Sequence, residues 1–187
     1  NWSKGEIPVH LPDRIPRIVC GWTPSSSKKF AEELKHITYH KTNDLKFFVM
    51  NVEAFSTSRG TKAAYEFLLK NPENMVVVDE STTIKNRKAA RTKNIMELRN
   101  VSLYRRILTG SPVTKSPMDL FSQCFFLSPR ALGFNSYYAF QNRYAQVQSR
   151  TMGNRSFQEI VGYRRLDELN EKLLSFSNRT LKEDCLD

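Results

Sequence analysis

Short, uninterrupted apolar segments that alternate with helical segments are the feature that most constrains the fold of this chain. Such apolar segments predict strands at residues 15–22, 46–52, 75–78 and 106–109. Between them, the spacing of apolar side chains predicts helices at residues 28–37, 61–70 and 88–99. Strands that alternate with helices form a parallel sheet with helices on both faces, and continuous apolar runs are typical of strands buried on both sides. The sequence therefore predicts an α/β fold with a parallel sheet.

The pattern changes after Pro112. Apolar and aromatic spacing predicts helices at residues 117–128, 135–148 and 166–176. We expect Tyr137, Phe140 and Tyr144 to lie in a core, because their spacing is helical. Residues 150–158 are polar and include Gly153, which predicts a mobile loop.

The charge of the chain indicates a polyanionic partner. Its 187 residues carry a formal net charge of +10, and the pI is about 9.7. A surplus of this size favours nucleic acid, because lysine and arginine displace counterions from phosphates. A basic surface that only confers solubility is the alternative interpretation.

The cysteines and the apolar segments of the chain indicate where in the cell it is expected. Cys20, Cys124 and Cys185 are far apart and odd in number, which suggests neither a disulfide framework nor a metal clip. We therefore expect a reducing, cytoplasmic location. No segment is long and apolar enough to cross a membrane, so no membrane partner is expected. Since the sequence starts at Asn1 rather than at Met, we also expect a piece of a longer chain.

Two adjacent acids, Asp79 and Glu80, follow the apolar strand predicted at residues 75–78. In open α/β sheets, ligands bind outside the carboxyl ends of the strands. One acid there can hold hydrated Mg²⁺ on nucleotide phosphates, and its neighbour can orient or deprotonate an attacking water. Solvated carboxylates at a strand end explain the same two residues equally well.

A second apolar strand ends in the string Leu-Thr-Gly-Ser-Pro at residues 108–112. Thr109 lies 30 positions after Asp79 (109 − 79), which leaves room for one crossover helix and a parallel return strand. Thr109 and Ser111 are then expected near the two acids, where hydroxyl groups can relay hydrogen bonds. A plain strand–turn is the alternative, because Gly-Ser-Pro is ordinary turn chemistry.

Together these strings resemble the Swi/Snf group of superfamily-two helicase-like ATPases. Residues 79–86, Asp-Glu-Ser-Thr-Thr-Ile-Lys-Asn, resemble the Asp-Glu-Ala-His motif with its trailing Lys-Asn, and residues 108–112 resemble Leu-Thr-Gly-Thr-Pro. Further segments match in order along nearly the whole chain: Asn1-Trp2, 48–53, 118–121, 126–129 and 175–184. The resemblance is closest to short phage or bacterial members.

The resemblance implies the first RecA-like lobe of a two-lobed motor. That fold is a three-layer P-loop NTPase lobe, here truncated at its N-terminus and followed by a helical extension. The expected division is a lobe at residues 1–133, a helical extension at 134–178 and the start of a linker at 179–187. The implied partners are ATP, Mg²⁺, double-stranded DNA and the missing second lobe of the same polypeptide.

The resemblance also implies roles for individual residues. Asp79 would bind Mg²⁺ through water, and Glu80 would activate the attacking water. Thr109, Gly110 and Ser111 would couple the nucleotide state to DNA contact. The expected nucleic-acid-binding residues are Asn51, Glu53, Lys85, Asn86, Arg87, Lys88 and Lys115. For the basic stretch at 85–106, a solvated helix face is an equally open interpretation.

Two departures from the family pattern change these expectations. Thr82 stands where the family has a histidine, and a threonine hydroxyl is shorter and does not titrate near neutral pH. The phosphate-binding pattern Gly-x-x-x-x-Gly-Lys-Ser/Thr is absent, and Arg59-Gly60-Thr61-Lys62 does not fit it. We therefore expect this chain alone to bind nucleotide weakly and to hydrolyse almost none.

The sequence is also compatible with other functions. A different superfamily-two motor, such as an RNA helicase or a restriction-enzyme translocase, is disfavoured by Ile84-Lys85-Asn86. A non-catalytic, basic nucleic-acid-binding domain with a degenerate motor fold is the alternative from another class. His36 and His40 have helical spacing, but the glutamate of a His-Glu-x-x-His zinc motif is missing.

Overall fold

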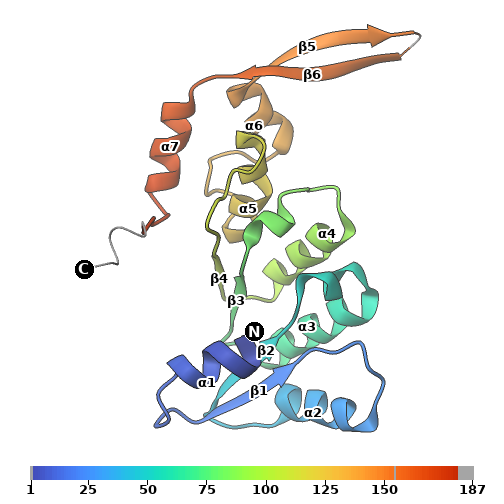
Figure 1. Ribbon diagram of the computed structural model, residues 1–187, viewed down its shortest axis with the longest axis vertical. Helices are drawn as coiled ribbons and strands as arrows, with labels where there is room; N and C mark the ends of the chain where they lie inside the picture. The colour runs from blue at the N-terminus through green and yellow to red at the C-terminus, as the bar shows by residue number, and fades with distance from the viewer. Residues whose placement is uncertain (1, 154, 181–187) are drawn as a thin grey trace. The chain divides into compact units, whose positions relative to one another are not determined.

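The computed structural model describes residues 2–153 and 155–180. It contains two compact units, Asn1–Leu108 and Thr109–Asp187, and each is described by itself (Figure 1). The sequence-based division into domains at residue 133 remains a prediction.

The first unit contains two pairs of parallel strands, and the predicted α/β class is confirmed. β1 (Arg17–Gly21) pairs with β2 (Leu45–Val49), and β3 (Met75–Val78) pairs with β4 (Tyr104–Ile107). Among the residues that the structure describes, the hydrogen bonding forms two separate pairs rather than one continuous sheet. Each pair consists of consecutive strands joined by their own crossover helix, as parallel pairing requires.

Two helices of the first unit, α2 and α3, begin at capping side chains. α2 (Lys28–Tyr39) is capped by Ser27, whose hydroxyl accepts from the Phe30 amide at 3.3 Å. α3 (Ser58–Lys70) is capped in the same way by Thr57. α4 (Ala90–Glu97) continues into the short helix η4 (Leu98–Asn100). The remaining short helices are η1 (Trp2–Glu6), α1 (Ile7–His10), η2 (Val52–Ser56) and η3 (Ser81–Ile84).

The expectation that the strands are buried on both faces is wrong for β3. Val78 is buried, whereas Met75 and Val77 are 52% and 45% exposed. Successive side chains of a strand point to opposite faces, so Met75 and Val77 share one face and Val76 and Val78 the other. Only the second of these faces is covered within the described part of the chain.

The second unit is built around an aromatic-rich core. In the described part of this unit, the helices are η5 (Pro117–Asp119), α5 (Leu120–Leu127), α6 (Tyr137–Tyr144) and α7 (Leu166–Leu174). Phe140 and Tyr144 are fully buried, and Tyr137 packs against the same cluster, which confirms their predicted place in the core. The buried cluster comprises Met118, Leu120, Phe121, Cys124, Leu132, Phe140, Tyr144, Ala145 and Leu169.

The structure corrects the sequence prediction between residues 145 and 163. α6 ends at Tyr144 instead of continuing to residue 148, and β5 (Ala145–Met152) and β6 (Arg155–Tyr163) form an antiparallel hairpin (Figure 1). The predicted loop at 150–158 is therefore mostly strand, and the extension at 134–178 is not purely helical. Gly153 has a positive φ of 60°, which suits a glycine at the hairpin turn.

Some predictions fall outside the described residues. These are the motif position Asn1, the end of the 175–184 match, most of the linker at 179–187, and Cys185. Cys20 and Cys124 are free and buried. Among the described residues, no helix combines the length and apolarity needed to cross a membrane.

Candidate functional site

The two adjacent acids, Asp79 and Glu80, lie at the carboxyl end of β3 and are exposed. Backbone hydrogen bonds hold the chain on both sides of them. The Leu108 amide donates to the Val78 carbonyl at 2.9 Å, and the Ser81 amide donates to the Leu108 carbonyl at 2.9 Å. The acids therefore sit on a short turn whose two ends are fixed to the end of β4.

Glu80 has a left-handed backbone conformation, with φ 49° and ψ 56°. A side chain other than glycine costs about 1 kcal/mol or more there, and such strain gathers at functional sites. The residues that follow Glu80 hold its backbone in this conformation. Ser81 is fully buried, and the Thr83 amide donates to the Glu80 carbonyl at 2.9 Å, starting η3. The fold thus enforces one backbone geometry at this acid.

Two donors orient the Asp79 carboxylate. The indole N–H of Trp2 donates to Asp79 Oδ2 at 2.8 Å, and the Glu80 amide donates to Oδ1 at 3.0 Å. Each carboxylate oxygen has two lone pairs, so both oxygens keep an acceptor position free for other ligands. The sequence did not predict the bond from Trp2, because Asn1-Trp2 was noted only as part of a family pattern.

The donor chemistry at this site fits a hydrated Mg²⁺ ion. Mg²⁺ is commonly held by one or two carboxylates, with waters and substrate phosphates completing its octahedron. Asp79 supplies one exposed, oriented carboxylate of this kind. No cluster of three or more potential metal ligands occurs among the described residues, and the stacked rings of His36 and His40 belong to none.

The hydroxyls of the 109–111 segment, which belongs to the second unit, make local hydrogen bonds. Thr109 Oγ1 accepts from the Ser111 amide at 3.2 Å, and Ser111 Oγ donates to the Val113 carbonyl at 3.1 Å. A side chain added at Gly110 would meet no atom within 4 Å. These contacts are those of a turn, and the coupling role of the segment remains a prediction.

Asn51 and Glu53, two of the predicted nucleic-acid-binding residues, have structural contacts in the first unit. The Asn51 side chain caps η2 by accepting from the Ala54 amide at 3.0 Å. Glu53 forms an ion pair with Arg91 of α4. The Asn94 amide group also joins α4 to η2, by donating to the Phe55 carbonyl at 2.7 Å. These bonds fix α4 against the segment that follows β2.

The turn between η3 and α4 carries most of the other predicted nucleic-acid-binding residues. Asn86 Oδ1 accepts from the Lys88 amide at 3.0 Å, and both residues are exposed, whereas Lys85 and Arg87 are half-buried. Residues 85–93 contain five basic side chains and no acid. This segment consists of the turn and the first residues of α4; we call it the basic turn, and it directly follows η3.

Lys115 lies in the second unit, in a turn organised by Asp119. The amides of Lys115 and Thr114 donate to Asp119 Oδ2 at 3.0 and 3.1 Å. Partial burial raises the pKa of Asp119, but these hydrogen bonds outweigh it and leave the pKa below its ordinary value. The Lys115 side chain is exposed on this ordered turn.

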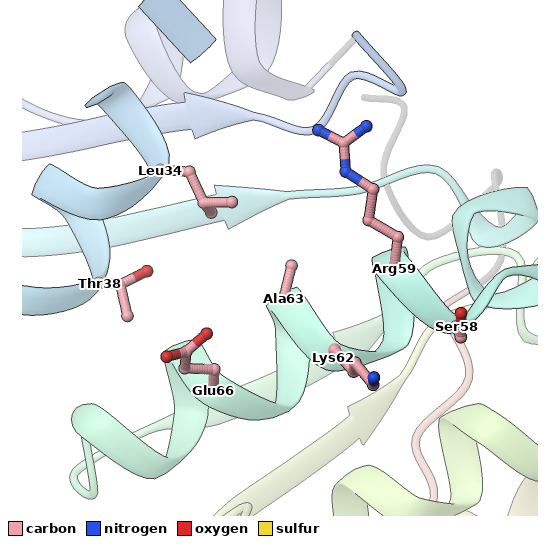
Figure 2. A pocket seen from close by; sticks show the side chains of 7 residues that line it. All are labelled: Leu34, Thr38, Ser58, Arg59, Lys62, Ala63 and Glu66. Carbon is pink, nitrogen blue, oxygen red and sulfur yellow. The ribbon is translucent and has the colours of Figure 1, made fainter. Parts of the chain in front are cut away.

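A cavity of about 390 Å³ lies between α2 and α3 in the first unit (Figure 2). The Arg59 guanidinium at its rim donates to the carbonyls of Pro24 and Ser25 and lies 5.6 Å from the centroid of the Trp22 ring. Glu66 accepts from Tyr39. The cavity is lined by Leu34, Thr38, Ser58, Arg59, Lys62, Ala63 and Glu66, and neither acid of the pair is among them.

The segment Arg59–Lys62 is the first part of α3 and not a phosphate-binding loop. A Cβ atom on Gly60 would lie 2.3 Å from the Ala54 carbonyl oxygen. The glycine therefore serves the close packing of α3 on η2.

Comparison with known proteins places the chain in one family. The family described as SNF2-related domain matches residues 1–184. The TATA-binding protein-associated factor mot1 of Schizosaccharomyces pombe is 36% identical over 121 residues, which cover 64% of this chain and 6% of that protein. The DNA annealing helicase and endonuclease ZRANB3 of Bos taurus is 31% identical over 147 residues, 73% of this chain and 14% of that protein.

Among solved structures, the Sulfolobus solfataricus SWI2/SNF2 ATPase core in complex with dsDNA has a TM-score of 0.36 and 26% identity to this chain. The match covers 70% of this chain and 28% of that one. This chain therefore spans a small part of the proteins that it matches. The match along residues 1–184 shows that the chain belongs to the family of SNF2-related domains.

Proposed function

We propose that this chain is part of the first, RecA-like motor lobe of an ATPase that moves along double-stranded DNA. The observation that carries the proposal is the acid pair at the end of β3. There Asp79 is oriented by two hydrogen bonds, and Glu80 is held in a left-handed conformation beside it. Membership of the SNF2-related family supports the same proposal.

In this proposal the two acids have different tasks. Asp79 holds the waters of a Mg²⁺ ion, with its carboxylate already oriented by Trp2 and the Glu80 amide. Glu80 orients the attacking water and takes its proton. Mg²⁺, when bound with ATP, supplies charge stabilisation on the phosphates during an in-line displacement. Thr109, Gly110 and Ser111 couple this site to DNA contact, and Thr82 takes the place of the family histidine.

Nucleotide binding needs more than this chain contains. The 187 residues hold no phosphate-binding loop of the Gly-x-x-x-x-Gly-Lys-Ser/Thr type. We propose that this loop and the second lobe belong to other parts of a longer polypeptide, as the 6% and 14% shares of the relatives support. This chain alone then binds ATP weakly and turns over almost none.

Double-stranded DNA is the proposed track. The net charge of +10 and the five basic side chains of the basic turn support a phosphate-binding surface. The name of the ZRANB3 relative refers to DNA annealing. Lys85, Asn86, Arg87, Lys88 and Lys115 are the proposed contacts, together with the segment at Asn51 and Glu53. We further propose a phage or bacterial source and a reducing intracellular location, on the sequence resemblance and the cysteine pattern alone.

The proposal is tested by Glu80→Gln in the intact protein. The amide keeps the size of the side chain but cannot take a proton, so ATP hydrolysis falls about 100-fold or more while ATP binding persists. Glu73→Gln is the matched control, because Glu73 is an exposed acid just before β3. Retained hydrolysis in Glu80→Gln would refute the role of Glu80 and favour a degenerate, nucleic-acid-binding lobe.

A further inference from the structure

The base of the β5–β6 hairpin is anchored to the second unit. Ala145 is 2% exposed, and Ile160 packs against the buried cluster. The Arg164 amide donates to the Tyr144 carbonyl at 2.8 Å, and its guanidinium donates to the Asn142 carbonyl at 2.6 Å. Beyond this base, Figure 1 shows both strands running clear of α5, α6 and α7.

The two faces of the hairpin differ in chemistry. The pairing register places Val147 opposite Ile160, Ser149 opposite Gln158 and Thr151 opposite Ser156 on the face that meets the core at the base. The other face, which we call the arginine face, is made of three cross-strand pairs: Gln148–Glu159, Arg150–Phe157 and Met152–Arg155. Both arginines of the hairpin strands and its two largest outer apolar side chains therefore share one face.

The arginine face is open to solvent. Met152 is 77% exposed and Phe157 is 46% exposed. Arg150 forms an ion pair with Glu159, while Arg155 makes no hydrogen bond or ion pair with any described residue. An isolated two-stranded ribbon is only marginally stable in water, and its exposed apolar side chains gain nothing from folding. A partner that covers this face would supply the missing burial.

Charge identifies the kind of partner. Residues 143–165 contain five arginines, no lysine and a single acid, Glu159. Guanidinium groups bind phosphate oxygens in a bidentate manner, and narrow grooves of negative potential attract inserted basic side chains. Apolar side chains beside such arginines are typical of proteins that lie in the minor groove, where they pack on sugars or wedge between base steps.

We propose that the arginine face of the β5–β6 hairpin binds the sugar–phosphate backbone of duplex DNA. Arg150 and Arg155 contact phosphates, and Met152 and Phe157 pack against the sugars between them. The eight residues of β5 span roughly 27 Å, enough to follow about 8 base pairs. This inference rests on the proposed function, because the choice of duplex DNA as the bound polyanion comes from it.

The test is duplex DNA affinity of the intact protein, measured by fluorescence anisotropy over a range of salt concentrations. Arg155→Gln should weaken binding about three- to tenfold and lower the slope of log K against log salt by about one. Phe157→Ser should weaken binding with little change in that slope, since it removes no charge. Arg130→Gln is the matched control, because Arg130 is an exposed arginine of the same unit outside the hairpin.

Circular dichroism of each variant checks that the second unit remains folded. If folded Arg155→Gln and Phe157→Ser bind DNA as tightly as Arg130→Gln, the inference is overturned. Loss of affinity in Arg155→Gln supports it even if the protein shows no DNA-stimulated ATP hydrolysis, a result that would refute the proposed function alone. If the hairpin binds a partner protein instead of DNA, both variants should keep the DNA affinity of Arg130→Gln.

Discussion

Asp79 shows how one residue of a strand-end site depends on a distant one. Its carboxylate is oriented by the amide of the next residue and by an indole 77 positions earlier in the chain. Donors that fix a carboxylate reduce the freedom lost when a cation binds, so a site prepared in this way binds its ion more readily. We therefore expect Trp2 to act as a positioning residue for the proposed Mg²⁺ site.

Trp2→Phe tests this positioning role. Phenylalanine keeps the aromatic ring but cannot donate to Asp79, so the Mg²⁺ concentration for half-maximal ATP hydrolysis in the intact protein should rise about three- to tenfold. The matched control is Trp22→Phe, which changes the other tryptophan, one that packs on Phe30 and Phe48. A Mg²⁺ requirement that is the same in Trp2→Phe as in the wild type would show that the hydrogen bond has no such role.

Glu168 links the stability of the second unit to pH. It accepts from Arg143 and from the Tyr144 hydroxyl, the latter at 2.9 Å. The bond from Arg143 is the main cause that lowers the pKa of Glu168 below its ordinary value. Burial, with help from Glu168, raises the pKa of Tyr144 to about 12. Glu168 therefore stabilises the fold above its unfolded-state pKa, and this stabilisation is lost as pH falls through the lowered folded-state pKa.

The corresponding prediction concerns the melting temperature between pH 6 and pH 3. In Glu168→Gln the melting temperature should be lower than in the wild type at pH 6, and the difference should shrink as the pH falls. Glu171→Gln, an exposed acid on the same helix, should follow the wild-type curve. A pH-independent difference between Glu168→Gln and the wild type would mean that the carboxylate charge does not contribute.

At the level of residues, the sequence predicted what is local and missed what is distant. Asp79 and Glu80 were predictable, because they directly follow an apolar strand. The Trp2 bond has no local pattern, since the fold alone brings it to Asp79. The left-handed backbone at Glu80 was also missed, because glycine or asparagine normally marks such positions. The structural contacts of Asn51 and Glu53 were also missed, because they form only once η2 is folded and α4 is packed beside it.

Among the elements, α3 packs so closely on η2 that only glycine fits at position 60. Gly60→Ala adds a Cβ 2.3 Å from the Ala54 carbonyl oxygen, a backbone atom that cannot rotate away. The variant should lose about 1–3 kcal/mol of unfolding free energy, although alanine is the better helix former. Chemical denaturation measures this loss. Gly5→Ala is the control, since a Cβ there meets nothing within 4 Å, and equal stability of the two variants would contradict the packing argument.

The sequence predicted the elements that carry a pattern of apolar side chains and missed those that do not. Helices α2 and α3 and the four parallel strands were found, because each carries a run or stripe of apolar side chains. The β5–β6 hairpin was missed because most of its residues are exposed and polar, so no continuous apolar run marks either strand. The regular aromatic spacing up to Tyr144 then extended the predicted helix into the first strand of the hairpin.

At the scale of the whole molecule, the order of the motifs was more informative than any single motif. Each string has an ordinary structural explanation, but their order along the chain indicated the family that the match over residues 1–184 then showed. The α/β class followed from the alternation of strands and helices. The pairing of the strands into two separate pairs did not, because an apolar run does not specify its neighbours.

The most direct test of the central claim is ATP hydrolysis by the intact protein with Mg²⁺, measured as duplex DNA or duplex RNA is added. The account predicts that duplex DNA stimulates hydrolysis about tenfold or more, that RNA does so much less, and that Glu80→Gln abolishes the stimulated rate. Hydrolysis that responds equally to RNA would point to another kind of superfamily-two motor. Absence of hydrolysis under every condition would contradict the account.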